Sequence, residues 1–186
     1  MSNKINVLVI IKDHLSTLKN YNNGKISVID VSVLLILPLI IVLLLAYYKY
    51  AINKEFVSLV VNFSSIVTSL LISVLVLIYD QYSKIRPEND TQTLKKKVLE
   101  QLFSNVSFTI LMGIITVIFC LLLNIYSTNS NGSYQIPNYS ISIGEYAFTI
   151  HFMEMCFTPV ILFFLLQMIL TLFMALKRLH IIFFAR

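Results

Sequence analysis

The polar side chains with the most regular spacing in this chain lie inside apolar stretches. One set recurs at helical steps, which places it on one face of a helix. Its members are Ser58, Asn62, Ser65, Ser69 and Ser73. In lipid, such hydroxyl and amide groups hydrogen-bond between closely packed helices, or they line a wet path for ions. Asn62 is the first residue to test between these two interpretations.

A second set with the same kind of spacing follows in a later apolar stretch. It consists of Thr109, Gly113, Thr116, Cys120 and Asn124. We expect this set to pack against the first, either within one chain or across an interface between chains. Polar faces on two helices favour a homo-oligomer, and a single four-helix bundle that buries them is the alternative.

Sequence patterns of catalysis or cofactor binding are absent. The chain contains no GxxxxGK[ST], GxGxxG, HExxH or GxSxG pattern, and its two cysteines form no CxxC pair. The three histidines lie on different segments, with His14 and His180 expected on one side of the membrane and His151 on the other. We therefore expect no catalytic residues, no cofactor and no metal site, and we interpret the chain as non-enzymatic.

Four apolar stretches must position these side chains, and none of them contains a charged residue or a histidine. They cover residues 31–48, 56–79, 106–126 and 157–176. Each is close to the length of about 20 residues with which a helix crosses about 30 Å of lipid. A mean hydropathy of +0.83 and only 12% charged residues exclude an ordinary globular domain. The sequence therefore predicts an all-α integral membrane protein with four transmembrane helices, in contact with the lipid bilayer.

The lysines and arginines predict the orientation of these helices. Twelve of the 14 lie in the N-terminal segment 1–27, the central loop 80–105 or the tail 177–186, and none lies in loop 127–156. By the positive-inside rule, both termini and the central loop are cytoplasmic. The Ile-, Asn- and Lys-rich composition is typical of a bacterial protein, so we expect a multi-pass protein of the inner membrane. Cations beside apolar spans suit lipid headgroups, and we expect no direct binding of nucleic acid.

The cytoplasmic cations are the candidate contacts for lipid headgroups or for a partner protein. They are Lys84, Arg86, Lys95, Lys96, Lys97, Lys177 and Arg178. We interpret the run Lys95–Lys97 as a headgroup anchor, and docking of a soluble partner is the alternative. Leucines and a valine at helical spacing between 94 and 102 predict a helix that continues from this loop into the third span.

Two shorter elements are predicted outside the spans. Apolar residues at helical spacing in segment 5–18, flanked by lysines, predict an amphipathic helix in the cytoplasmic membrane interface. Apolar residues alternate along 139–152, with Gly144 and Glu145 between two runs, which predicts a small extracytoplasmic β-hairpin.

The first two spans carry a resemblance to a known family. Residues 34–39 read Leu-Leu-Ile-Leu-Pro-Leu, and after a short turn the second span ends in Leu-Val-Leu-Ile-Tyr-Asp at 75–80. With a cytoplasmic leucine-rich helix and two further spans, this layout resembles the small four-helix membrane proteins of bacterial anti-phage defence loci, in particular the family of KwaA, the membrane subunit of the Kiwa system. The resemblance implies an inner-membrane homo-oligomer that senses envelope perturbation and scaffolds a soluble DNA-binding partner from the same operon.

Two other functions stay open on the sequence alone. The hydroxyl-lined helix faces would also suit an ion channel or a pore-forming effector, although no charged residue lies in the middle of a span, as ion-coupled transporters usually require. A small membrane immunity or accessory protein that binds another membrane protein through lipid is the third interpretation.

Overall fold

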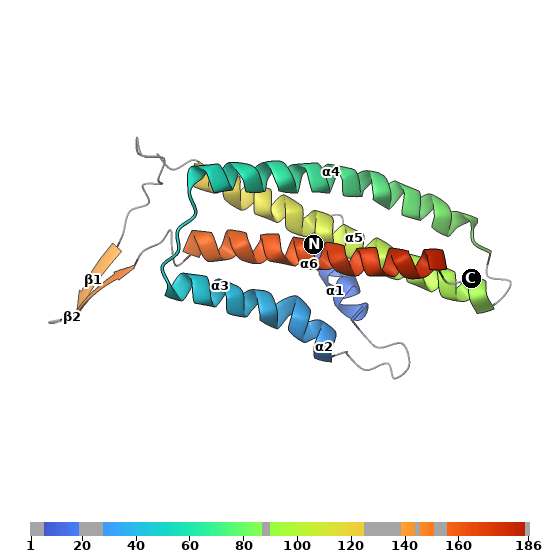
Figure 1. Ribbon diagram of the computed structural model, residues 1–186, viewed down its shortest axis with the longest axis horizontal. Helices are drawn as coiled ribbons and strands as arrows, with labels where there is room; N and C mark the ends of the chain where they lie inside the picture. The colour runs from blue at the N-terminus through green and yellow to red at the C-terminus, as the bar shows by residue number, and fades with distance from the viewer. Residues whose placement is uncertain are drawn as a thin grey trace.

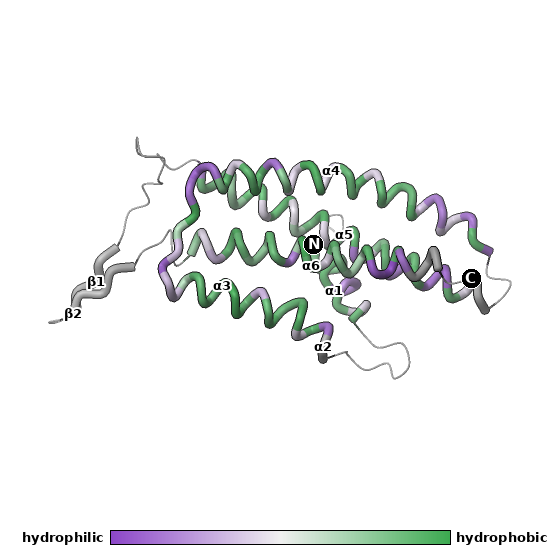
Figure 2. The backbone as a smooth tube through the Cα atoms, viewed as in Figure 1, coloured by the Kyte–Doolittle hydropathy of each residue, from purple (hydrophilic) through white to green (hydrophobic). Residues whose placement is uncertain are grey.

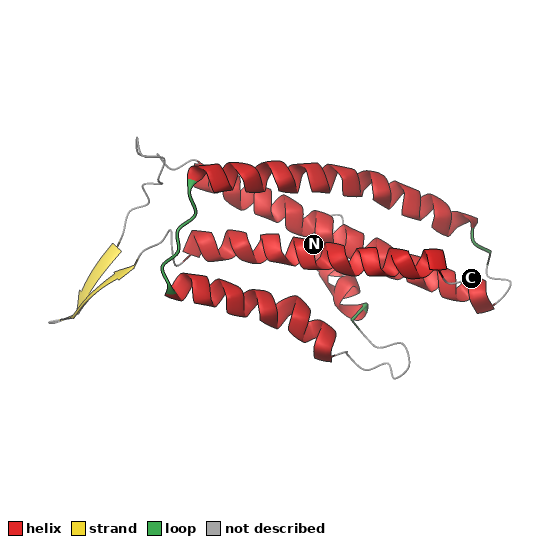
Figure 3. Cartoon of the chain, in the orientation of Figure 1, coloured by secondary structure: helices red, strands yellow, loops and turns green. Residues whose placement is uncertain are grey.

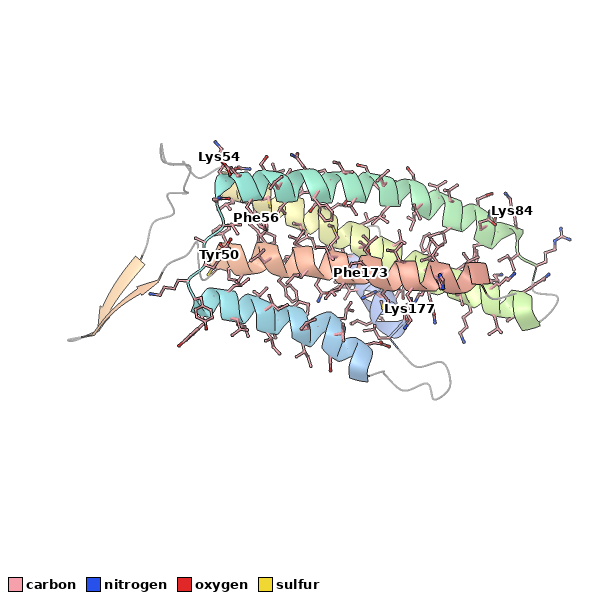
Figure 4. All side chains as sticks on the ribbon, viewed as in Figure 1. Tyr50, Lys54, Phe56, Lys84, Phe173 and Lys177 are labelled. Carbon is pink, nitrogen blue, oxygen red and sulfur yellow. The ribbon has the colours of Figure 1, made fainter. Side chains whose placement is uncertain are left out.

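The computed structural model describes residues 6–18, 28–86, 90–124, 139–143, 146–150 and 156–184. Long helices lie side by side along one axis, and a short helix crosses them near the middle (Figure 1). The helices are α1 (Val7–Ser16), α2 (Val28–Val31), the π-helical turn η2 (Ser32–Ile36), α3 (Leu37–Tyr47), α4 (Lys54–Lys84), α5 (Asp90–Asn124) and α6 (Thr158–Phe184). We call the two ends of this bundle the Lys54 end and the Lys84 end, after the residues at either end of α4 (Figure 4).

Three helices are long and apolar enough to cross a membrane: α4, α5 from Gln92 onward, and α6 as far as His180. The first predicted span corresponds to the apolar helix Ser32–Tyr47, which is shorter than these three. The structure therefore supports a membrane protein with three candidate spanning helices, and the first predicted span, residues 31–48, stays a prediction.

The bundle helices consist of hydrophobic residues along most of their length (Figure 2). On α4, Leu59, Ile66 and Leu70 are each more than 60% exposed, and α3 exposes Leu39, Leu43 and Leu44 by at least half. So large a surface of exposed aliphatic side chains is unfavourable in water. It is the surface expected of helices in contact with lipid tails, and Figure 2 shows hydrophilic residues concentrated toward the helix ends.

Helix α5 is the centre of the packing, because it lies against both α4 and α6, while α3 packs on α6 and α1 packs on α5. Two clusters of buried side chains hold α4, α5 and α6 together. Toward the Lys54 end the cluster is formed by Ile52, Val57, Val60, Cys120, Leu123 and Ile161. Toward the Lys84 end it is formed by Leu71, Ile78, Leu99, Leu102, Val106 and Ala175.

Most of the predicted central loop is helical. Helix α4 continues to Lys84, and α5 runs without a break from Asp90 to Asn124, through most of the third predicted span, as the leucine spacing predicts. Strands β1 (Tyr139–Ile143) and β2 (Tyr146–Ile150) pair antiparallel, with Tyr139 opposite Ile150 (Figure 3). They occupy the segment where apolar residues alternate in the sequence, and the side of the membrane on which they lie stays a prediction.

Candidate functional site

The polar set of α4 lies on the exposed face of that helix. Ser58, Asn62, Ser65, Ser69 and Ser73 all have exposed side chains, and the hydroxyl of Ser69 donates to the carbonyl of Ser65 at 2.8 Å. The structure thus does not bring this set against the set of α5 within one chain. Contact between the two sets would require a second copy of the chain or another protein.

The polar set of α5 faces the bundle interior instead. Thr109, Gly113 and Thr116 are buried, and Asn124 is exposed where α5 ends. Both threonine hydroxyls donate to the carbonyl four residues earlier in their own helix, at 2.8 Å. These hydroxyls are therefore satisfied within α5 and line no open path between the helices.

Gly113 sets the distance between α5 and its neighbours. A Cβ atom added at this position would overlap the hydroxyl oxygen of Thr68 and come within 3.1 Å of the sulfur of Met168. Ser64 and Thr68 form the buried polar part of α4, on a different face from the set predicted from the sequence. The helical spacing of Val57, Ser64 and Thr68 could have indicated this face. Because α4 has serines on both faces, the sequence does not show which face is buried.

A group of polar side chains joins α1, α5 and α6, and we call His14, Thr17, Asn105 and Arg178 the polar junction. His14 is fully buried, its Nδ1 lies 3.1 Å from Asn105 Oδ1, and its ring stacks on Phe108 with centroids 3.9 Å apart. The Thr17 hydroxyl lies 3.0 Å from the same amide oxygen. The Arg178 guanidinium donates to the main-chain carbonyls of Thr17 and Gln101, both at 2.9 Å. Since these carbonyls belong to different helices, Arg178 joins α6 to both.

Burial governs the charge of the histidine in this junction. Removal of His14 from water lowers its pKa from 6.5 to about 4, and the positive charge of Arg178 adds to that effect, while the hydrogen bond to Asn105 opposes it. Because Oδ1 of Asn105 only accepts, Nδ1 of the neutral ring carries the hydrogen. Protonation would then place a charge on the buried Nε2, which has no partner among the described residues.

The polar junction also lies at a definite distance from the Lys54 end of the bundle. A hydrocarbon layer of about 30 Å corresponds to about 20 helical residues. Counted from the Lys54 end, that length ends close to Ser73 on α4, Asn105 on α5 and Arg178 on α6. The contacts of Asn105 and Arg178 through α1 agree with this alignment.

The predicted contact cations fall into three groups. Lys84, Arg86, Lys97 and Lys177 are exposed, and Lys84 forms an ion pair with Asp80 at 2.6 Å. Lys95 and Lys96 are half-buried, and the ammonium of Lys96 lies 4.8 Å from the centre of the Tyr82 ring. Arg178 differs from the others, because its guanidinium is held inside the polar junction.

Several of these residues were not predicted from the sequence. The buried positions of His14 and Asn105 went unrecognised, although His14, Thr17 and Leu18 share a helix face.

Among the described residues, no three His, Cys, Asp or Glu side chains gather in a way that could hold a metal ion. No known protein family, no curated protein and no solved structure matches this chain.

Proposed function

We propose that this chain is a non-enzymatic membrane scaffold that holds a soluble partner protein at the cytoplasmic face of a bacterial inner membrane. The observation that supports this is the length of α4 and α5. At 1.5 Å per residue, helices of 31 and 35 residues are roughly 46 and 52 Å long, well beyond the roughly 30 Å of the hydrocarbon layer.

The excess length of both helices lies at the Lys84 end, beyond the predicted spans, as a helical hairpin formed by residues 80–86 and 90–105. In Figure 4, Lys177 of α6 lies well short of Lys84 along the bundle axis, so α4 projects past the level at which the cations of α6 begin. The projecting hairpin carries five of the predicted contact cations. A charged helical projection of this kind suits electrostatic docking of a protein, whereas a basic run beside a span suffices for anchoring to a membrane surface.

The biological setting that we propose rests on the resemblance to the membrane subunits of anti-phage defence systems. In that setting, the partner is a DNA-binding protein encoded in the same operon, and the β1–β2 hairpin lies outside the inner membrane, where it senses disturbance of the envelope. The exposed polar face of α4 supports self-association in the membrane, because exposed hydroxyls and an amide find partners on another helix in lipid.

Neutralising the lysines of the helical hairpin formed by α4 and α5 tests the proposal that this chain is a scaffold. The triple variant Lys95→Gln, Lys96→Gln, Lys97→Gln should lose most capture of the protein encoded by the neighbouring gene in detergent pull-downs, and should lose phage protection. Lys49→Gln with Lys54→Gln, which neutralises cations at the other end of the bundle, should leave both unchanged. Full capture and full protection by the triple variant would refute the proposal.

An oligomeric channel is the second candidate, favoured by the outward position of the α4 set. Within one chain the buried threonines offer no path, so a pore would have to form between copies that face one another through Ser58, Asn62 and Ser65. Planar-bilayer conductance that Asn62→Leu reduces, and that Ile66→Leu on the same exposed helix leaves unchanged, would establish the channel. Absence of conductance, even with the partner protein and phage present, would exclude the channel.

A further inference from the structure

A cavity of about 630 Å³ opens between α1, the end of α4 and the first half of α5. This volume lies within the range of about 300–1,000 Å³ that small-molecule sites occupy. Its wall is apolar at Ile10, Ile78 and Phe103, and polar at the side chains discussed below. None of the functions proposed above uses this cavity, although Lys97 in its lining is also one of the cations proposed for docking.

The cavity crosses the depth at which the hydrocarbon layer ends. Ser104 and Ser107 line it at the level of the polar junction, and Lys97 and Glu100 line it roughly 6–10 Å farther along α5 toward the Lys84 end. Along α5 the lining thus changes from Phe103, Ser104 and Ser107 to the charged Lys97 and Glu100, with Leu99 between these two. A ligand with a charged head and apolar tails matches this gradient, whereas a fully water-soluble ligand does not.

The charges of the lining specify the head of that ligand. One cation, Lys97, and two carboxylates, Asp13 and Glu100, border the cavity. The hydroxyl of Tyr82 donates to Glu100 Oε1 at 2.8 Å, which holds one carboxylate in place and leaves lone pairs for a further donor. Ser104 adds a buried hydroxyl that has no partner among the described residues.

We propose that this cavity binds a zwitterionic phospholipid with a primary amine, the chemistry of phosphatidylethanolamine. Its ammonium group donates to Asp13 and Glu100, and its phosphate accepts from Lys97. Its acyl chains leave past Ile10 and Phe103 into the surrounding lipid. The other common headgroups match less well, because the choline group has no N–H donor and the glycerol headgroup has no cation. This proposal depends on the membrane placement of the helices and is independent of any soluble partner.

Native mass spectrometry of the full-length protein, stripped of lipid in detergent, tests this assignment. Phosphatidylethanolamine, phosphatidylcholine and phosphatidylglycerol are each added at equal concentration. We expect the first to be retained about tenfold more tightly than the second, the difference that one charge-assisted hydrogen bond makes. Equal retention of all three lipids, or a preference for phosphatidylglycerol, would overturn the proposal.

Charge variants identify the site. Asp13→Asn combined with Glu100→Gln should remove the preference for the ethanolamine headgroup. The control Glu55→Gln makes the same kind of chemical change at an exposed position at the Lys54 end of α4, away from the cavity, and should retain the preference. A preference that survives in the first variant would contradict the assignment.

A cavity-filling variant separates this site from lipid that merely coats the helices. Ser107→Leu should abolish retention of phosphatidylethanolamine, while Ser73→Leu on the exposed face of α4 should not. Circular dichroism shows whether each variant keeps its helices. If Ser107→Leu loses them, the charge variants decide the question. If a folded Ser107→Leu retains the lipid as the native chain does, the cavity is not the site.

Discussion

Gln167 on α6 donates a 2.7 Å hydrogen bond to the main-chain carbonyl of Leu34, four residues before Pro38. In an α-helix that carbonyl would accept from the N–H of residue 38, which proline lacks. The chain passes through the π-helical turn η2 at this point, and Pro38 stands at the beginning of α3. The side-chain amide of Gln167 thus takes the place of the missing main-chain donor. It joins η2 and α3 to the rest of the bundle.

Removal of this donor should loosen α3 from α6. We expect Gln167→Met, which preserves the side-chain length, to lower the free energy of unfolding by about 1–3 kcal/mol, because the buried carbonyl of Leu34 loses a hydrogen bond. Pro38→Ala restores a main-chain donor at residue 38. Gln167→Met should therefore cost less in the Pro38→Ala background, and a double-mutant cycle of unfolding in detergent measures that difference. Strictly additive effects would contradict the assigned role of the glutamine.

A methyl group at Gly113 should force α4 and α5 apart. The added Cβ overlaps the Thr68 hydroxyl, so we expect Gly113→Ala to destabilise the bundle by about 1–3 kcal/mol, although alanine is the better helix former. Thr68→Ala should relieve part of that loss when the two changes are combined. Ile114→Ala, at an exposed neighbouring position, is the control. A stabilised Gly113→Ala variant would show that the helices separate at little cost.

The extent of the helices could be predicted from the sequence, because uninterrupted apolar stretches and leucine spacing report directly on single helices. The elements that pack on each helix face could not be predicted from the sequence. Helix α4 has serines on two faces, and periodicity identifies a face without identifying what packs on it. His14 illustrates the same limit: the apolar residues of its helix predict a lipid-facing stripe, whereas partners on two remote helices bury the histidine. Leu8 and Leu15 of that stripe are exposed, whereas Leu18 at its end is buried.

The two native cysteines provide a test of orientation. Cys120 is buried, and Cys156 is exposed immediately before α6, at the Lys54 end. If the basic Lys84 end is cytoplasmic, a membrane-impermeant maleimide added outside the inner membrane should label Cys156. Cys156→Ser should abolish the label, and Cys120→Ala should leave it unchanged. Labelling that requires inverted vesicles would reverse the predicted orientation.

The polar junction should weaken on acidification. The pKa of His14 is lowered from 6.5 to about 4 by burial, so above pH 6.5 the ring is neutral whether α1 is docked or released, and docking is at full strength. Between pH 6.5 and about 4 the released helix binds a proton more readily than the docked helix does. Docking of α1 therefore becomes weaker as the pH falls through this range. Below about pH 4 both forms are protonated, and no further loss is expected from this group.

Amide hydrogen exchange in α1 measures this loss directly. After correction for intrinsic rates, residues 7–16 should be less protected at pH 5 than at pH 7.5 in the native chain, because Arg178 and the surrounding apolar side chains leave no favourable place for a charged ring. His14→Gln, which keeps a donor for Asn105 and cannot titrate, should show the same protection at both pH values. His180→Gln, at an exposed position on α6, should retain the native pH dependence. A difference between pH 5 and pH 7.5 that persists in His14→Gln would assign the pH response to another group.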